Sequence, residues 1–487
     1  MSTIEPKGGH RPNLDTVSVL DDQGSRKYVY PADTKGRWTR LKPFVYAILI
    51  ALYASLPFIT INGNPAVWID LPKRHFFLLG ATFNAQDFYM MFFVLTGIGF
   101  TLIVTAAVFG RLWCGWACPQ TVFLDGVFRR IERWIEGPAE KRRRLANGPM
   151  TTEKFFKKLL KHAIYLVLAV VIAHIFLAYF VSVDGLEAMI TEGPAEHGTT
   201  FGWAVAMSLI IYGNFWWFRE QLCIVICPYG RLQSVLQDAD TINVIYDSTR
   251  GEPRGKIKAK AAGEPVGDCI DCGRCIAVCP TGIDIRNGNQ LECIGCTYCI
   301  DACDEIMVKV NRPKGLIRYD SERMITEGKR RFWRPRLFFY MFMGIAGLTV
   351  AIVIISQNKV FEATVLRGGS TFVLGDTEVI NNMRVQVVNK HNADTTFTLS
   401  ALPETAAYIT LPQPSVTLPR FGDYDLPVLV KVPYDKFERN MEIPLRVDDS
   451  HSGTHRIVIM KMLGPHRRMK PKTPTETTET PPIGETP

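Results

Sequence analysis

Five apolar runs stand out along the chain, each about as long as a helix that crosses a bilayer core, roughly 20 residues. They cover residues 43–61, 87–109, 162–183, 201–218 and 337–356. Buried helices of soluble proteins usually carry a polar stripe, and these runs mostly lack one. The pattern therefore predicts a multi-domain membrane protein with five transmembrane α-helices. The fourth run gives the weakest signal, because it is short and contains Gly213 and Asn214.

A different pattern begins after the fifth apolar run. Residues 362–462 contain short runs of alternating apolar and polar positions, such as 383–388 and 428–432. Turn-forming Pro, Gly, Asn and Asp separate these runs roughly every eight to twelve residues, which is typical of a β-sandwich. The segment contains no Cys. Residues 466–487 are rich in Thr, Pro and Glu and are expected to be disordered.

Basic residues set the expected orientation in the membrane, because cytoplasmic segments carry an excess of Lys and Arg. Basic residues flank the first, second, third and fifth runs, and examples are Lys35, Arg37, Arg40, Lys42, Arg111, Arg142, Lys161, Lys329 and Arg334. Residues 184–200, between the third and fourth runs, contain no Lys or Arg. This distribution predicts a cytoplasmic N-terminus, a cytoplasmic insert between the fourth and fifth runs, and an external C-terminus. The net charge of +9 is thereby assigned to membrane topology, and no nucleic-acid partner is expected.

The insert between the fourth and fifth runs contains a repeated cysteine pattern, C-x2-C-x2-C-x3-C. Its cysteines are Cys269, Cys272, Cys275, Cys279, Cys293, Cys296, Cys299 and Cys303. This is the ligand pattern of bacterial ferredoxins with two 4Fe-4S clusters, in which the fourth cysteine of each run ligates the other cluster. Cys303 is therefore expected to join the first three cysteines, and Cys279 to join the later three. Structural zinc sites usually have two separated C-x2-C pairs, and a disulfide knot is the other alternative.

A second cysteine pattern, C-x3-C-P, occurs at the ends of two apolar runs. Its members are Cys114, Cys118 and Pro119 in one copy, and Cys223, Cys227 and Pro228 in the other. Cysteines at positions i and i+4 would share one helix face, and the proline would bend or end the helix. Residues 121–136 and 229–237 then read as amphipathic surface helices. If the two copies pack by pseudo-symmetry, four thiols should surround one point.

Three interpretations of these four cysteines remain open. Free Cys packs well as a small apolar residue, but such packing would not explain a C-x3-C-P motif that occurs twice. Disulfides are disfavoured on the reducing cytoplasmic side. We favour a redox-active thiol set that binds a soft metal, either copper(I) or the iron of a third cluster. This assigns both catalytic and metal-binding roles to Cys114, Cys118, Cys223 and Cys227.

The expected domain organisation follows from these patterns. It comprises an N-terminal tail (1–42), a four-helix membrane domain (43–239), a cytoplasmic ferredoxin domain (240–336), a fifth transmembrane helix (337–357), a β-sandwich domain (358–465) and a disordered tail (466–487).

The order of these parts resembles the CcoG/FixG (RdxA) family, the cytochrome c oxidase accessory proteins. The stretches FGRLWCGWACPQTVF and CIDCGRCIAVCPTGIDIRNGNQLECIGCTYCIDACDEIM carry the resemblance most specifically. The resemblance covers roughly residues 30 to 465. It implies an immunoglobulin-like sandwich in the periplasm, a bacterial inner-membrane location, and a role in assembly of cbb-type oxidase. The family is associated with reduction of copper(II) to copper(I), and its membrane half is similar to the quinol-linked ferredoxin subunits of periplasmic nitrate reductase.

These features predict a membrane-bound electron-transfer protein that acts as a cupric reductase during oxidase assembly. No nicotinamide or flavin motif is evident, so the electrons would come from a cytoplasmic donor. The resemblance implies a copper transporter and oxidase assembly components as further partners. Two other functions remain open. One is a respiratory relay between quinol and a periplasmic reductase, and the other is a non-enzymatic assembly scaffold.

Overall fold

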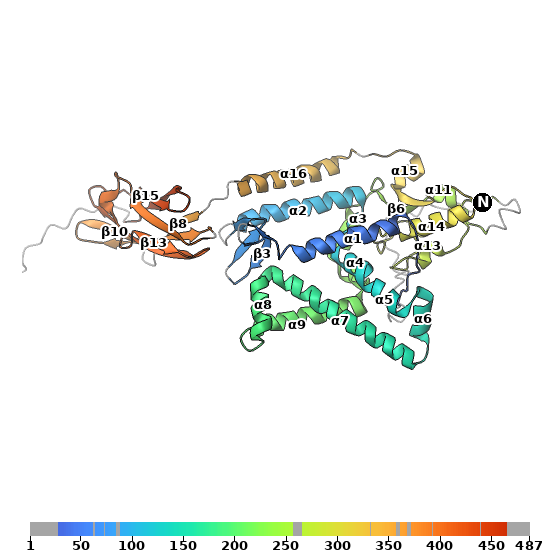
Figure 1. The fold of residues 1–487 in the computed structure, drawn as a ribbon. Coiled ribbons are helices and arrows are strands. Elements are labelled where there is room, and N and C mark those ends of the chain that lie inside the picture. Colours follow the sequence, from blue (N-terminus) through green and yellow to red (C-terminus); the bar gives the residue numbers. More distant parts are fainter. Residues whose placement is uncertain are drawn as a thin grey trace, which may run out of the picture. The chain divides into compact units, whose positions relative to one another are not determined.

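The computed structural model describes residues 28–61, 64–72, 74–83, 88–256, 265–331, 333–356, 361–367, 372–391, 393–438 and 440–464. The chain divides into two compact units. The first contains most residues up to Ile355, and the second contains the residues from Ser356 onward together with the short segment that ends at Asn64. Figure 1 shows long helices and the cysteine-rich segment in the first unit, and a β-structure in the second. We describe each unit by itself.

Long helices dominate the first unit. They are α1 (Arg37–Ser55), α2 (Phe88–Phe109), α7 (Thr152–Val181), α9 (Gly198–Gly213) with its π-helical continuation η4 (Asn214–Phe218), and α16 (Pro335–Ser356). Four stretches among the described residues are long and apolar enough to cross a membrane. They are Phe92–Phe109, Thr152–Val181, Gly198–Phe218 and Pro335–Val353. These correspond to the second to fifth runs of the sequence, including the weak fourth one.

The first apolar run differs from its expected form. Helix α1 begins at Arg37 and ends at Ser55, after which the chain turns and enters strand β1 (Thr60–Ile61). Pro57 cannot donate a backbone hydrogen bond, which disfavours continuation of the helix. The apolar part of α1, residues 43–55, is therefore shorter than the roughly 20 residues that a span needs. The transmembrane span expected at residues 43–61 is not confirmed.

Small residues allow the long helices to approach one another closely. A Cβ placed on Gly97 of α2 would lie 3.6 Å from the backbone nitrogen of Leu348 in α16. Helix α7 packs on α9, where Ala169, Ala173 and Ala204 are buried. Such close backbone approach is typical of helix packing in membranes.

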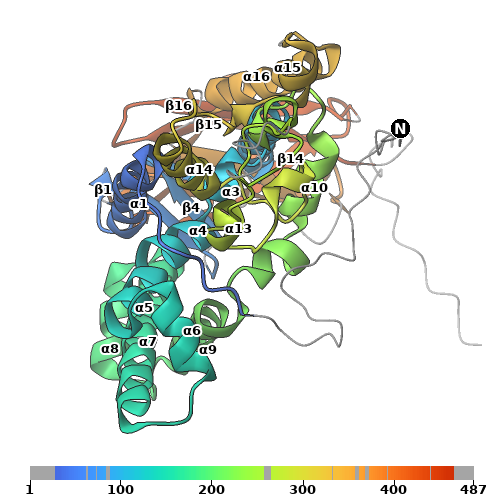
Figure 2. The ribbon, with the colours of Figure 1, turned by 90° about the vertical axis from the view of Figure 1, so that its right-hand side faces the viewer.

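In Figure 2, helices α5 to α9 gather on one side of the unit, away from α13 and α14.

Short helical elements follow α2, α7 and η4. They are α3 (Leu112–Trp116), α4 (Pro119–Phe123), η3 (Leu124–Phe128), α5 (Arg129–Glu136), α6 (Ala139–Asn147), α8 (Val183–Glu192), η5 (Leu222–Ile226) and α10 (Pro228–Leu236). The expected surface helix 121–136 is thus three consecutive helical pieces, and α10 lies where the second surface helix is expected. Between α1 and α2 lie β2 (Asn64–Pro65) and a three-stranded sheet of β3 (Val67–Asp70), β4 (His75–Leu78) and β5 (Ala81–Phe83).

The cysteine-rich segment folds around one small antiparallel sheet. Strand β6 (Asn243–Tyr246) pairs with β7 (Ile317–Asp320), so the two ends of the insert meet. Between them lie α11 (Ser248–Gly251), α13 (Arg274–Ala277), η6 (Ile285–Asn287) and α14 (Tyr298–Lys309), and α15 (Glu322–Glu327) follows β7. The buried residues Val244, Met307 and Ile317 pack with the cysteines in one apolar cluster.

The second unit is the expected sandwich of two antiparallel sheets. One sheet has the order β12-β14-β10-β8 with β9 on β10, and the other has the order β13-β11-β15-β16. The strands are β8 (Phe361–Arg367), β9 (Val373–Leu374), β10 (Glu378–Asn389), β11 (Thr395–Ala401), β12 (Ile409–Thr410), β13 (Ser415–Leu418), β14 (Asp423–Pro433), β15 (Glu442–Asp449) and β16 (His455–Lys461), with the short helix η7 (Ala406–Tyr408) before β12. Alternate residues of β14 and β15 point into one apolar core, as the period of two predicts.

Candidate iron–sulfur site

Four of the ferredoxin-type cysteines line one cavity. They are Cys269, Cys272, Cys275 and Cys303. Tyr246, Ile270, Met307, Leu316 and Ile317 form much of its wall. Cys269 and Cys272 come from the loop that leads into α13, Cys275 lies in α13 itself, and Cys303 comes from α14. This is the grouping that the crossed ferredoxin pattern requires.

The other four cysteines line a second cavity, which Cys275 also touches. They are Cys279, Cys293, Cys296 and Cys299. Val244, Ile283, Ile285 and Ile294 make its wall largely apolar, which limits access of water. Because Cys275 lines both cavities, groups bound in them would be close neighbours.

Burial disfavours the ionised, thiolate form of these cysteines. Burial raises the pKa of Cys275 and Cys293 to about 11, and that of Cys303 to about 12. Metal ligation requires the thiolate, so a bound cationic group would have to supply the stabilisation. Among the residues that the structure describes, no three His, Cys, Asp or Glu side chains are grouped to hold a single ion. Two cavities that each carry four thiols suit iron–sulfur cubes, which the same residues would hold.

The membrane-side cysteines are arranged differently from the prediction. Cys114 lies in α3, but Cys118 has an extended backbone and is the N-cap of α4, with Pro119 as its first residue. The second copy matches, because Cys223 lies in η5 and Cys227 caps α10. The two cysteines of each pair therefore do not share one continuous helix face. The proline starts a new helix here, a position it favours because its missing N–H is not needed there.

The four thiols nevertheless lie in one neighbourhood. Burial, then the proximity of Cys118 and Cys114, raises the pKa of Cys223 to about 12. The thiol of Cys114 donates to Gln233 Oε1 at 3.2 Å, and Gln233 is fully buried. Here too, no three His, Cys, Asp or Glu side chains among the described residues are grouped to hold a single ion. Each helix break places the two thiols of a pair on different elements, and a common binding point for the four thiols stays a prediction.

The segment that carries Cys114 touches the wall of the second cavity through its neighbour Gly115. A Cβ on Gly115 would lie 2.7 Å from the carbonyl carbon of Gly295 and 2.9 Å from the carbonyl oxygen of Ile294. Gly115 follows Cys114, and Gly295 precedes Cys296. The absence of a side chain at position 115 therefore lets the two backbones touch. Sequence reasoning missed this contact, although a glycine between two bulky tryptophans in the first motif was a usable signal.

Aromatic side chains surround the same contact. The Trp116 indole donates to the hydroxyl of Tyr319 at 3.1 Å, and that hydroxyl donates to the carbonyl of Gly295 at 3.3 Å. Trp38 packs edge-on against Trp116, with ring centroids 5.7 Å apart. Tyr46 donates to the carbonyl of Gly115 at 3.0 Å. These contacts fix the two cysteine-bearing segments against each other.

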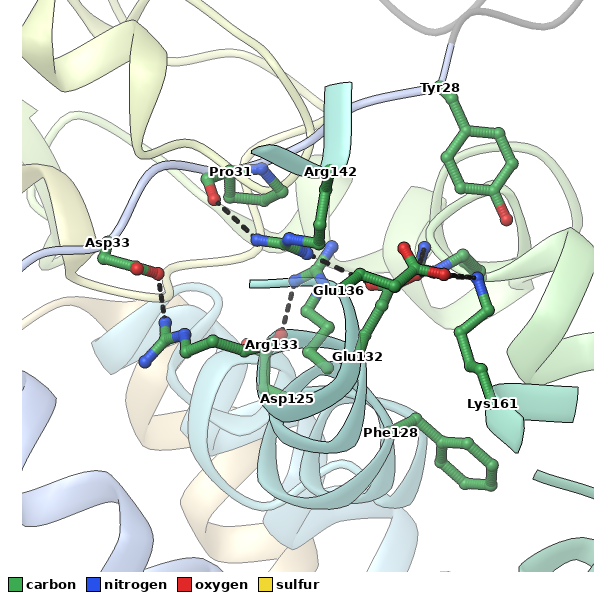
Figure 3. Close-up of polar contacts among 12 residues, drawn as sticks. Tyr28, Pro31, Asp33, Asp125, Phe128, Glu132, Arg133, Glu136, Arg142 and Lys161 are labelled. Carbon is green, nitrogen blue, oxygen red and sulfur yellow. Dashed lines mark hydrogen bonds and ion pairs between the residues drawn. The ribbon is translucent and has the colours of Figure 1, made fainter. Parts of the chain in front are cut away.

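A buried ion network lies beside this region, on α5 and its neighbours (Figure 3). Glu132 is 3% exposed and accepts from Arg142 at 3.1 Å and from Arg219 at 3.0 Å. Burial alone would raise the pKa of Glu132, but Arg219, Lys161 and Arg142 outweigh it and hold the pKa at about 2. Arg142 and Lys161 thus have a structural role in addition to their expected role in membrane orientation.

Comparison with known families supports iron–sulfur chemistry in both cysteine regions. Residues 218–322 match a family model described as a 4Fe-4S dicluster domain, and residues 90–138 match one described as a 4Fe-4S binding domain. Residues 351–459 match the "IG-like fold at C-terminal of FixG". The second match contains Cys114 and Cys118, so the first membrane-side pair lies within an iron–sulfur family pattern.

Curated relatives match over most of the chain. Protein RdxB of Cereibacter sphaeroides is 34% identical over 84% of this chain and 89% of that protein. Protein RdxA of the same organism is 34% identical over 77% of this chain and 82% of that protein. Nitrogen fixation protein FixG of Rhizobium meliloti is 40% identical over 63% of this chain and 61% of that protein.

Proposed function

Because the chain belongs to the FixG/RdxA family of iron–sulfur redox proteins, we propose that it reduces copper(II) to copper(I) for assembly of cbb-type cytochrome c oxidase. The observation that carries the proposal is the contact of Gly115 with Gly295. It joins the segment that carries Cys114 to the wall of the second cysteine cavity. Electrons entering at the ferredoxin domain would have a short route to the membrane-side thiols.

Each set of residues has a role in this proposal. The eight ferredoxin-type cysteines would hold two 4Fe-4S clusters, which exchange single electrons when bound. Each copper(II) ion, as substrate, would take one electron and become copper(I). Thiols favour this soft ion, so Cys114, Cys118, Cys223 and Cys227 would bind copper and receive the electron. The electron would originate from a cytoplasmic reductant. The basic residues beside the apolar helices support a cytoplasmic ferredoxin domain and an external sandwich.

The function can be tested with the full-length protein in detergent. Anaerobically reduced protein should be reoxidised rapidly by copper(II), and a copper(I)-specific chelator should trap one copper(I) for each electron lost. Quinone should reoxidise it slowly. Rapid reaction with quinone alone would instead favour the respiratory relay, and inertness to both oxidants would favour the scaffold.

The crossed ligand assignment predicts which substitutions act together. The intact protein should contain about eight iron atoms, four in each cluster. Cys272→Ala and Cys303→Ala should remove the same cluster, because both side chains line the first cavity, whereas Cys279→Ala should remove the other. Iron analysis with electron paramagnetic resonance distinguishes these outcomes. If the spectrum of Cys303→Ala matched that of Cys279→Ala, the crossed assignment would be wrong.

A Gly115→Val variant should slow copper(II) reduction while the iron content stays normal. The added side chain would overlap the backbone of Gly295 and push the two cysteine-bearing segments apart. A misplacement of about 1 Å between reacting groups can cost on the order of 100-fold in rate. Stopped-flow kinetics should show this loss. Gly202→Val is the matched control, because a Cβ at Gly202 meets no atom within 4 Å. Equal rates in both variants would contradict a route through this contact.

A further inference from the structure

A third cavity lies beside the second cysteine cavity, and we refer to it as the lysine cavity. Lys42, Tyr46, Arg130, Val278 and Tyr298 are among its lining residues, and its volume is ≈ 100 Å³. On this scale one water needs about 10–15 Å³, so the cavity has room for a small polyatomic group. Val278 and Tyr298 directly precede Cys279 and Cys299, which line the second cysteine cavity. A ligand in the lysine cavity would therefore be separated from the second cysteine cavity by the chain segments that carry these residues.

Lys42 is the unusual group in this cavity. Its side chain is 2% exposed, and its Nζ atom has no hydrogen-bond partner. The ammonium lies 4.0 Å from the ring centroid of Tyr298, within the range of a cation–π contact. That contact alone leaves the donors of a buried ammonium unsatisfied, which is costly unless an anion pairs with it.

Cations outnumber carboxylates around the lysine cavity. Four arginines line it with Lys42, whereas Asp125 is the one carboxylate among its lining residues. Asp125 is already paired with Arg129, and the Tyr298 hydroxyl donates to it at 3.4 Å. Asp125 attracts the Lys42 ammonium but forms no ion pair with it.

Two of the other arginines are also occupied, as Figure 3 shows. Arg133 pairs with Asp33, and Arg142 pairs with Glu132 and donates to the carbonyl of Pro31. Arg130 makes no ion pair in the part of the chain that the structure describes. Among the described residues, Lys42 and Arg130 are thus the two cations of this small cavity that form no ion pair.

We propose that the lysine cavity binds an oxyanion of the phosphate class, either inorganic phosphate or the phosphate of a lipid head group. The Lys42 ammonium would donate hydrogen bonds to the anion, and the Arg130 guanidinium would neutralise its remaining charge. Hydrogen bonds between charged groups are the strong ones in such sites. The phosphate would supply the hydrogen-bond acceptor that the Lys42 ammonium lacks among the protein side chains.

Such an anion would contact residues that adjoin both sets of cysteines. Tyr298 precedes Cys299, and the Tyr46 hydroxyl bonds to Gly115 beside Cys114. Negative charge at this position opposes the addition of an electron nearby, so occupancy should lower the reduction potential of the group held in the second cysteine cavity. This consequence rests on the proposed function, whereas the binding site itself does not.

Phosphate binding can be measured on the full-length protein in a phosphate-free detergent. Inorganic phosphate should bind saturably to the unaltered protein and about 10- to 100-fold more weakly to Lys42→Met, the loss expected for a charged hydrogen bond. Lys42→Arg keeps the charge and should retain binding. Lys309→Met removes an exposed lysine and should bind normally. Iron content and circular dichroism check that each variant is folded.

The same samples identify the source of the phosphate. If phospholipid phosphorus copurifies with the unaltered protein but not with Lys42→Met, and delipidation opens the site to inorganic phosphate, the natural ligand is a lipid head group. Equal binding by the unaltered protein and Lys42→Met, or no phosphate in either form, would overturn the proposal. A potentiometric titration with and without phosphate should show a lower potential only in protein that binds it. Binding without that shift would leave the site intact and count against the proposed electron route.

Discussion

A Cys118→Ser, Cys227→Ser double variant should keep the iron of both ferredoxin-type cavities and lose copper(II) reduction. Neither thiol lines those cavities, so cluster content should not change. Both residues cap the helices that begin with Pro119 and Pro228, where serine is also a good N-cap. The substitution therefore preserves the local fold while it removes two soft ligands. Copper(I) production by reduced protein should fall to the rate seen without protein.

The control for this variant is Val235→Ser, which introduces a serine at an exposed position of α10. It should reduce copper(II) at the normal rate. Maturation of cbb-type oxidase in cells should follow the same order, with normal levels for the control and a deficit for the double variant. If the double variant matured oxidase normally, the four thiols would be packing residues and the proposed role would be wrong.

Glu132→Gln should destabilise the first unit by about 3–5 kcal/mol, the usual effect of removing one partner from a buried ion pair. Glu132 neutralises Arg142 and Arg219, and Lys161 lies 3.6 Å away. These cations link α5, α6 and α7 with the residue that follows η4. Without the carboxylate, three buried positive charges would repel one another. Denaturant unfolding followed by tryptophan fluorescence measures the free energy of unfolding.

Glu140→Gln is the matched control for this prediction. Glu140 pairs with Arg144 on the same helix, but both side chains are about four-fifths exposed. Its removal should cost less than about 1 kcal/mol. Equal destabilisation by the two variants would contradict the special role of Glu132.

Acid should test the same ion network. The pKa of Glu132 is held at about 2 in the folded protein, below the usual value of about 4.3 for an unfolded glutamate. A carboxylate with a lowered pKa adds stability that is fully present above the unfolded value and is lost as the pH falls towards the folded one. The unaltered protein should therefore lose this stability between about pH 4 and pH 2, and Glu132→Gln should lack that part of the acid dependence.

The features that sequence predicted best depend on short repeating patterns. The spacing of Cys269 to Cys303 fixes which cysteines group together, because three closely spaced thiols and one distant thiol are needed at each cluster. The sandwich follows from a period of two along strands such as β14. The second to fifth apolar runs gave helices because their length and composition are sufficient.

The missed features depend on contacts between segments that are far apart in sequence. The Gly115–Gly295 contact joins residues separated by 180 positions, and no local pattern encodes it. Glu132 looked like one charge on an amphipathic helix, because its partners Arg142 and Arg219 lie on other elements. At Pro119 the sequence left two outcomes open, a bend or an end of the helix, and the structure has an end followed by a new helix.

All cysteines of the chain precede the sandwich, which consequently needs neither iron nor thiol chemistry to fold. Its core consists of apolar side chains such as Phe361, Phe397 and Leu445. The ferredoxin-type cavities, in contrast, reach their final form only when their thiolates are bound, because cofactor binding and folding are coupled at such sites. Iron shortage during synthesis should therefore yield chains with a mature C-terminal unit and an incomplete N-terminal one. Quality control of this protein would have to recognise the N-terminal unit.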